Sequence, residues 1–131
     1  MRLLLDTHCW LWLGFEPKRL GRKTRALLSD LGNETYLSAV SAWEIVLKSA
    51  RGKLRLPADP ATYVRTRLRI SQTSPLDVNL EHALALTALP EIHRDPFDRM
   101  LVAQAQVEGM TIVTADQRIA RYNVLIHDAS V

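Results

Sequence analysis

Short apolar segments alternate with longer amphipathic segments along this chain of 131 residues, and that alternation constrains the fold more than any other feature. The short segments are typical of buried strands and fall at residues 2–5, 35–38, 111–114 and 124–127, and a further strand is assigned to the more polar residues 71–76. The longer segments repeat apolar residues at helical spacing. Ser38 and Asn79 are expected N-caps, and Asn79 begins a predicted helix at residues 79–89. Strands that alternate with helices favour βαβ units. We therefore predict an α/β/α sandwich, in which helices cover both faces of a mostly parallel sheet of about five short strands.

The length and composition indicate a single domain. A chain with 47% hydrophobic and 24% charged residues suits one hydrophobic core, and no linker or repeat divides residues 1–131. The one cysteine, Cys9, excludes an internal disulfide and is expected to be a buried apolar residue. The apolar start of the chain is interrupted at residues 6–8 and is too short to span a membrane. We expect a cytoplasmic protein without membrane association.

Basic residues outnumber acidic ones and gather locally. The chain has 17 lysines and arginines against 14 aspartates and glutamates, which gives a net charge of +3. The basic residues concentrate at residues 18–25, 48–55 and 65–69. Each cluster alone is compatible with a solvated helix face. Together, however, the clusters favour an anionic partner such as nucleic acid.

The segment HRDPFDRMLVAQA at residues 93–105 predicts a helix that carries a carboxylate in an unusual position. Asp95 is a favourable N-cap, and Pro96 suits the first helical position. Asp98 then shares its helix face with the apolar residues Leu101, Val102 and Ala105. A carboxylate on a core-facing stripe is costly unless a cation or a polar cleft compensates it. Asp98 is therefore a candidate functional residue, whereas Asp95 is interpreted as the helix cap.

Four acidic residues are expected at one edge of the sheet, because sites in open parallel sheets lie at the carboxyl ends of the strands. Asp6 and Asp116 follow predicted strands, and Glu44 and Asp98 lie near the starts of predicted helices. Adjacent carboxylates repel one another unless a cation is present, and a ligand set of oxygen atoms favours Mg²⁺ or Mn²⁺. For Glu44, an ion pair with Lys48 on the helix surface is the alternative.

Such a site supports the hydrolysis of phosphodiester bonds. A bound divalent cation would hold the phosphate and lower the pKa of a water molecule, and a carboxylate not engaged by the metal could accept the proton. The basic clusters would hold flanking phosphates. A metal-free ribonuclease with a histidine acid–base pair is an alternative. The four histidines lack metal-binding spacing and are His8, His82, His93 and His127.

Four segments carry a family resemblance and read LLLDTHCWLW, SAVSAWEIVLKSARGKLRLP, HRDPFDRMLVAQA and TIVTAD. They run in the expected order from the N-terminus to about Asp116. On these segments the chain resembles the PIN-domain ribonuclease toxins of bacterial toxin–antitoxin modules, the VapC family. The motif HRDPFDR followed by LVAQA is the most specific part of the resemblance.

The resemblance implies an endoribonuclease with a parallel α/β/α fold that cleaves RNA with Mg²⁺ or Mn²⁺. It implies a toxin that is inhibited by a cognate antitoxin and that forms a homodimer or a toxin–antitoxin hetero-oligomer. The residues that match the family's catalytic and metal-binding acids are Asp6, Glu44, Asp98 and Asp116. Thr114 matches a hydroxyl residue that supports the last acid, and Thr7 is expected to support the site as well.

Two other functions stay open at this stage. One is a non-catalytic regulatory protein that binds nucleic acid or an antitoxin, and the other is a PIN-fold nuclease that acts on DNA or flap structures. The role of Arg99 is undecided between a surface charge and an RNA contact. We expect Leu31 to face the core from a helix at residues 21–31, and we expect the three tryptophans to be core residues, namely Trp10, Trp12 and Trp43.

Overall fold

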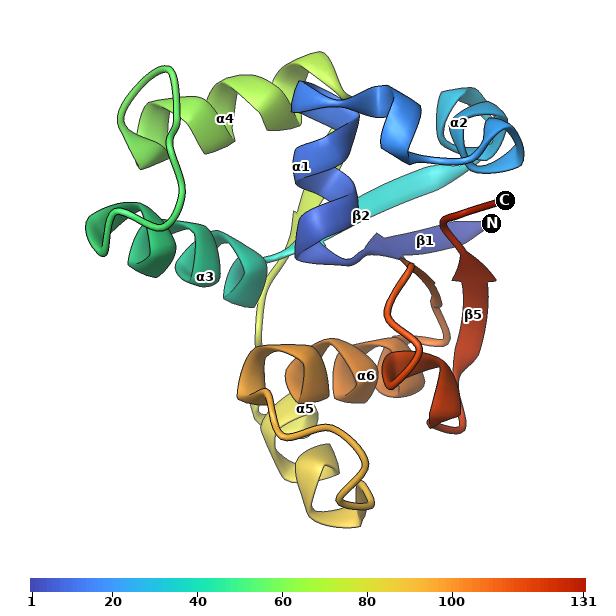
Figure 1. Cartoon of the computed structure of the whole chain (residues 1–131). Coiled ribbons are helices and arrows are strands. Elements are labelled where there is room, and N and C mark those ends of the chain that lie inside the picture. The colour runs from blue at the N-terminus through green and yellow to red at the C-terminus, as the bar shows by residue number, and fades with distance from the viewer.

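The computed structural model describes all 131 residues and is built around a five-stranded sheet (Figure 1). The strands are β1 (Arg2–Leu5), β2 (Glu34–Ser38), β3 (Thr73–Leu76), β4 (Thr111–Thr114) and β5 (Leu125–Asp128). Their order is β3-β2-β1-β4-β5, and every neighbouring pair is parallel. The prediction of a mostly parallel sheet of short strands is confirmed. Pro75 is tolerated in β3 because this strand lies at the edge of the sheet.

Helices connect the strands, and three of them begin at the predicted caps Ser38, Asn79 and Asp95. They are α1 (Thr7–Phe15), α2 (Arg22–Ser29), α3 (Ala39–Ala50), α4 (Pro60–Ile70), α5 (Leu80–Ala85) and α6 (Pro96–Glu108). Ser38 caps α3 by accepting the N–H of Val40, and Gly109 ends α6 with a φ of 66°. The helix expected at residues 79–89 is shorter, because it tightens into a 3-10 turn at Leu86–Ala88. None of the helices is both long and apolar enough to cross a bilayer.

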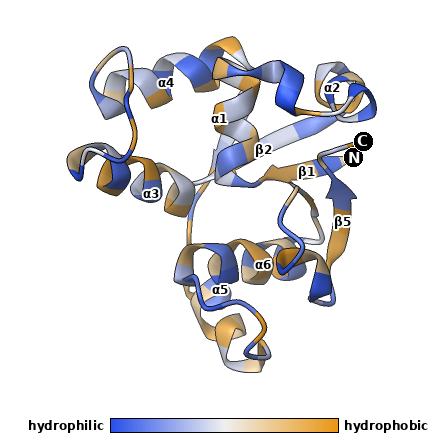
Figure 2. Ribbon diagram, viewed as in Figure 1, coloured by the Kyte–Doolittle hydropathy of each residue, from blue (hydrophilic) through white to orange (hydrophobic).

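The central strand β1 has apolar side chains on both faces, because helices cover both faces of the sheet. Leu4 packs with Leu101 of α6, whereas Leu5 packs with Trp10 of α1. Successive side chains of a strand point to opposite faces, so β1 alone requires two covered layers. Figure 2 shows β1 as a hydrophobic strand at the centre of the molecule, with α4 above it and α6 below it. The α/β/α sandwich is confirmed.

Two predictions about core side chains are wrong. Leu31 is 84% exposed, because α2 ends at Ser29 and residue 31 is no longer on the helix. Trp43 is 58% exposed and meets Phe97 edge to face, with ring centroids 5.2 Å apart. The buried face of α3 includes Glu44 instead, so residue 43 turns outward.

The remaining core predictions hold for the tryptophans of α1 and for the cysteine. Trp10 is buried and Trp12 is half-buried. Cys9 is fully buried, and its burial, together with the nearby Asp6 carboxylate, raises the pKa of the thiol to about 12. The thiol therefore stays protonated at neutral pH and behaves as a small apolar group.

Candidate metal centre

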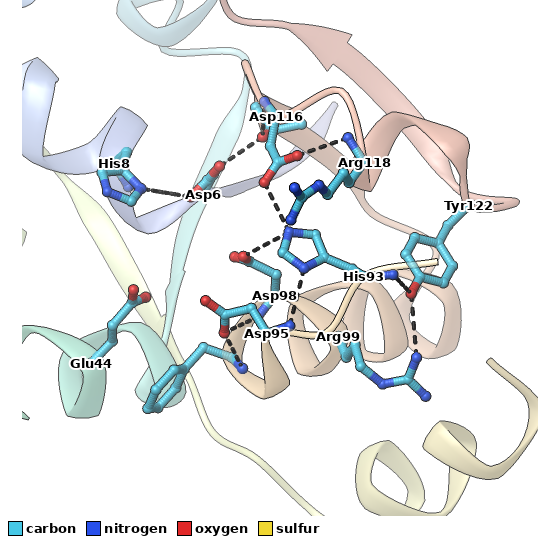
Figure 3. A network of polar contacts seen from close by, with 12 residues as sticks. Asp6, His8, Glu44, His93, Asp95, Asp98, Arg99, Asp116, Arg118 and Tyr122 are labelled. Carbon is cyan, nitrogen blue, oxygen red and sulfur yellow. Dashed lines mark hydrogen bonds and ion pairs between the residues drawn. The ribbon is translucent and has the colours of Figure 1, made fainter. Parts of the chain in front are cut away.

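The candidate site lies where the strand order reverses. From β1 the chain passes to β2 and β3 on one side of the sheet, and then to β4 and β5 on the other side. Asp6 follows β1 and Asp116 follows β4, and these two strands are paired neighbours. Asp98 comes from the first turn of α6 and faces both of them (Figure 3). The three aspartates line one pocket of about 270 Å³, as expected for a site at the carboxyl ends of parallel strands.

Thr114 fixes two of the acids with one hydroxyl group. Its Oγ1 donates to Asp6 Oδ2 at 2.6 Å and accepts the backbone N–H of Asp116 at 3.0 Å. Asp6 Oδ1 in turn accepts the N–H of His8 at 3.2 Å and so caps α1. One hydroxyl group thus connects Asp6 and Asp116, and the supporting role of Thr114 in the site stays a prediction.

The start of α6 is fixed by local capping, as predicted. Asp95 Oδ1 accepts the N–H groups of Phe97 at 2.8 Å and Asp98 at 3.4 Å, and Pro96 occupies the first helical position. The cap leaves the Asp98 side chain free to point at the ends of the strands. Asp95 is therefore the cap, and Asp98 belongs to the pocket.

Burial and charge repulsion disfavour an ionised Asp98. Burial is the larger cause, followed by the carboxylates of Asp6, Asp95, Glu44 and Asp116, and together they raise the pKa of Asp98 to about 8. Burial also raises the pKa of Asp6 in spite of its hydrogen bond from Thr114. A cation in the pocket would reverse this balance, because it favours the ionised form of every carboxylate around it.

Glu44 lies at the border of the acid cluster. Its side chain is buried, and Oε2 accepts from Lys48 Nζ at 2.8 Å while Oε1 has no hydrogen-bond partner. The carboxylate is close enough to raise the pKa of Asp98, but it does not line the pocket of the three aspartates. The ion pair with Lys48 and a place beside the acid cluster are therefore compatible, because Glu44 pairs with Lys48 while its own side chain is buried next to the cluster.

Thr7 does not contact the acids. Its Oγ1 donates to Ser41 Oγ at 2.7 Å in a buried hydrogen bond that ties α1 to α3. Any support that Thr7 gives to the site therefore acts through the packing of these two helices.

His93, one of the four histidines without metal-binding spacing in the sequence, completes the cluster. Its Nε2 lies 2.9 Å from Asp116 Oδ2 and 3.1 Å from Asp98 Oδ2 (Figure 3). Burial acts to raise the pKa of Asp116, but the hydrogen bonds from His93 and from the Arg118 amide outweigh it and lower that pKa. Ligand atoms of His93, Asp98 and Asp116 all lie within 4.8 Å of one another. In the sequence, the available signal for His93 was its position two residues before the cap Asp95, in the same motif as Asp98.

Arg99 has a structural role that the sequence left undecided. Its Nη1 donates to the carbonyl of Pro90 at 2.9 Å and to the hydroxyl of Tyr122 at 3.3 Å. The guanidinium group therefore ties the loop before α6 to the segment after β4.

A PIN domain family model matches residues 3–125 of the chain. The chain belongs to the PIN-domain family. This PIN domain is 47% identical to ribonuclease VapC16 of Mycobacterium tuberculosis over 60 residues, which are 46% of this chain and 43% of that protein. The match thus spans less than half of the length of that relative. A match to ribonuclease VapC22 of the same organism has 25% identity over 118 residues and covers 89% of this chain and 88% of that protein.

Solved structures of similar fold come from toxin–antitoxin complexes. VapBC2 from Rickettsia felis, bound to a DNA fragment from its promoter, has a TM-score of 0.73 and 15% identity over 98% of both chains. VapBC-1 from nontypeable Haemophilus influenzae has a TM-score of 0.68 and 16% identity over 100% of both chains. These likenesses establish the fold of this PIN domain.

Proposed function

We propose that this PIN domain is an endoribonuclease that depends on Mg²⁺ or Mn²⁺ and acts as the toxin of a toxin–antitoxin module. The observation that carries the proposal is the pocket lined by Asp6, Asp98 and Asp116 at the carboxyl ends of β1 and β4. The curated relatives are named ribonucleases, which supports RNA as the substrate.

The residues of the pocket fit a hard divalent cation. Carboxylate oxygens are the ligands that Mg²⁺ and Mn²⁺ prefer. Burial, followed by the repulsion of the neighbouring acids, raises the pKa of Asp98, and a bound cation would offset both causes. Glu44 Oε1 is a buried acceptor without a protein partner, and a cation or a water molecule would satisfy it.

The three aspartates of the pocket share one proposed role, and Glu44 has another. Asp6, Asp98 and Asp116 would hold the cation, with Asp6 fixed by the Thr114 hydroxyl. When bound, the cation supplies charge for the phosphate and a water of lowered pKa. Glu44 Oε1 would serve either as a further ligand or as the acceptor of the proton from the attacking water. Because water attacks, the RNA 2′-hydroxyl is not consumed, and the downstream product carries a 5′-phosphate.

A cognate antitoxin is the proposed inhibitory partner. The solved neighbours include three VapBC complexes, and two of these are bound to DNA. We propose that this PIN domain likewise forms a homodimer or a hetero-oligomer with its antitoxin. Induced expression in bacteria should arrest growth, and co-expression of the protein encoded beside it should restore growth.

The decisive experiment compares cleavage of an unstructured RNA and a DNA oligonucleotide of the same sequence by the purified protein. Cleavage of RNA that requires Mg²⁺ or Mn²⁺, stops with EDTA and leaves 5′-phosphate ends supports the proposal. Full activity in EDTA, or cyclic phosphate ends, would point to histidine chemistry instead. Preferential cleavage of DNA would contradict RNA as the substrate. The absence of any cleavage would favour a non-catalytic binding protein.

A further inference from the structure

His93 is held in one orientation by hydrogen bonds on three of its atoms. Its Nδ1 accepts the backbone N–H of Asp95 at 3.1 Å, and its backbone N–H donates to the Tyr122 hydroxyl at 2.8 Å. The Nε2 atom lies between Asp98 and Asp116. The side chain is only 6% exposed, so solvent provides no alternative partner.

These contacts determine the tautomer of the imidazole. A ring nitrogen that accepts an N–H must be unprotonated, so the ring proton of the neutral imidazole sits on Nε2. The Nε2–H group then donates to Asp116 Oδ2 at 2.9 Å, and Asp98 Oδ2 lies in polar contact 3.1 Å from the same nitrogen. In this tautomer Nε2 has no lone pair to offer a metal ion. His93 thus places an N–H group between the two acids and does not ligate the cation itself.

Tyr122 and Arg99 hold the backbone of His93 in place. The Tyr122 hydroxyl donates to the Pro90 carbonyl at 3.1 Å and accepts from Arg99 Nη1 at 3.3 Å. Arg99 also donates to the Pro90 carbonyl at 2.9 Å. The loop that carries His93 is therefore anchored from both α6 and the segment after β4, on the side away from the acids.

We infer that His93 is a positioning residue, which holds Asp98 and Asp116 side by side at ligand spacing before a cation binds. The inference rests on the proposed metal centre. Without a donor between them, the two carboxylates would move apart or hydrogen-bond to water, and binding a cation would require their reassembly. One donated hydrogen bond leaves lone pairs free on both carboxylates for the cation. Residues that orient metal ligands in this way typically change metal affinity 10- to 100-fold when replaced.

The test measures Mn²⁺ binding by isothermal titration calorimetry, with no RNA present. We expect His93→Ala to raise the Kd for Mn²⁺ about 10- to 100-fold and His93→Gln, which retains an N–H donor, to recover part of that loss. Tyr122→Phe should raise the Kd several-fold, because it removes the anchor of the loop without touching an acid. The matched control is Tyr36→Phe, which removes an exposed hydroxyl bonded to Glu34 and should leave the Kd unchanged.

A second measurement uses the wild-type protein, so that the test does not depend on whether a variant folds. Nitrogen-15 NMR of the metal-free wild-type protein should show His93 as the neutral tautomer with the proton on Nε2, and a proton on Nδ1 alone would overturn the inference. A folded His93→Ala protein that binds Mn²⁺ as tightly as the wild type, or more tightly, would overturn it as well. A wild-type protein that binds neither Mn²⁺ nor Mg²⁺ would instead overturn the proposed metal centre.

Discussion

His93 and His82 are both buried, and each accepts a backbone N–H at Nδ1, yet their Nε2 atoms face different surroundings. His93 Nδ1 accepts from Asp95 and His82 Nδ1 accepts from Asn79, in both cases at 3.1 Å. In their neutral forms both rings therefore carry the proton on Nε2. The local chemistry of the two histidines is the same, although they lie in different parts of the molecule.

The difference lies in what surrounds Nε2. His93 Nε2 donates to Asp116 and lies 3.1 Å from Asp98 Oδ2 at the edge of the sheet. His82 Nε2 has no hydrogen-bond partner between α5 and α6, and Glu108 Oε1 is 3.9 Å away. His82 instead completes a capping box with Asn79 at the start of α5. One ring thus orients the acids of the candidate site, while the other stabilises a helix end.

The largest expected effect is a loss of RNA cleavage, which should follow from a change in the acid pocket and not from a change between α5 and α6. Asp98→Asn should lower the rate of RNA cleavage by about 1,000-fold, because a metal ion's stabilisation of transition-state charge is worth several kcal/mol. Initial rates with a labelled RNA measure the effect. The matched control is Glu108→Gln beside His82, which should change the rate less than about twofold. An Asp98→Asn variant that keeps a tenth of the wild-type rate would contradict the proposed role.

The next effect concerns stability. His82→Ala should lower the free energy of unfolding by about 2–3 kcal/mol, because it removes a fully buried side chain and half of the capping box. Its affinity for Mn²⁺ should stay within twofold of the wild type, in contrast to His93→Ala. Urea unfolding and calorimetry provide the two measurements. If His82→Ala weakened metal binding as much as His93→Ala does, the distinction between the two histidines would fail.

A smaller effect concerns the pH dependence of stability in the metal-free protein. The folded-state pKa of Asp98, about 8, lies above the ordinary value of 3.8, so the folded protein holds a proton that the unfolded chain releases. The stability that this bound proton gives the folded protein is fully present below the ordinary pKa of 3.8 and is lost as the pH rises through the folded-state pKa of about 8. Between pH 6 and pH 8 the free energy of unfolding should fall by at least about 1 kcal/mol.

The variant Asp98→Asn separates this contribution from those of other groups. The decrease should be absent or much smaller in Asp98→Asn, and Mg²⁺ should suppress it in the wild type. Thermal unfolding at several pH values, with EDTA or with Mg²⁺, gives the comparison. Equal slopes in both proteins would show that burial of Asp98 does not cause the pH dependence.

The smallest effect is expected at Cys9, which lines the same pocket as the acids. The raised pKa of the thiol keeps it protonated and unreactive at neutral pH. Cys9→Ala should therefore change neither the cleavage rate nor the Mn²⁺ affinity by more than about twofold. A larger loss would mean that the thiol takes part in the site.

The sequence by itself determined the elements and most of the acid cluster. Strand positions and the caps Ser38, Asn79 and Asp95 depend on residues within a few positions, so local patterns were sufficient to predict them. The placement of Asp6 and Asp116 also followed from the sequence, because parallel strands bring their carboxyl ends to one edge.

Tertiary structure decided the features that depend on contacts between distant segments. The sequence left Glu44 open between the acid site and a surface ion pair with Lys48, and it predicted a buried Trp43, but the packing of α3 buries Glu44 and turns Trp43 outward. His93 is 23 residues from Asp116 in the chain, and only the packing of α6 beside β4 brings the two together. The backbone contact at Nδ1 is the same in His93 and His82, so that contact does not distinguish the two rings. Only the tertiary structure places His93 Nε2 within 3.1 Å of two carboxylates and leaves His82 Nε2 3.9 Å from Glu108 Oε1.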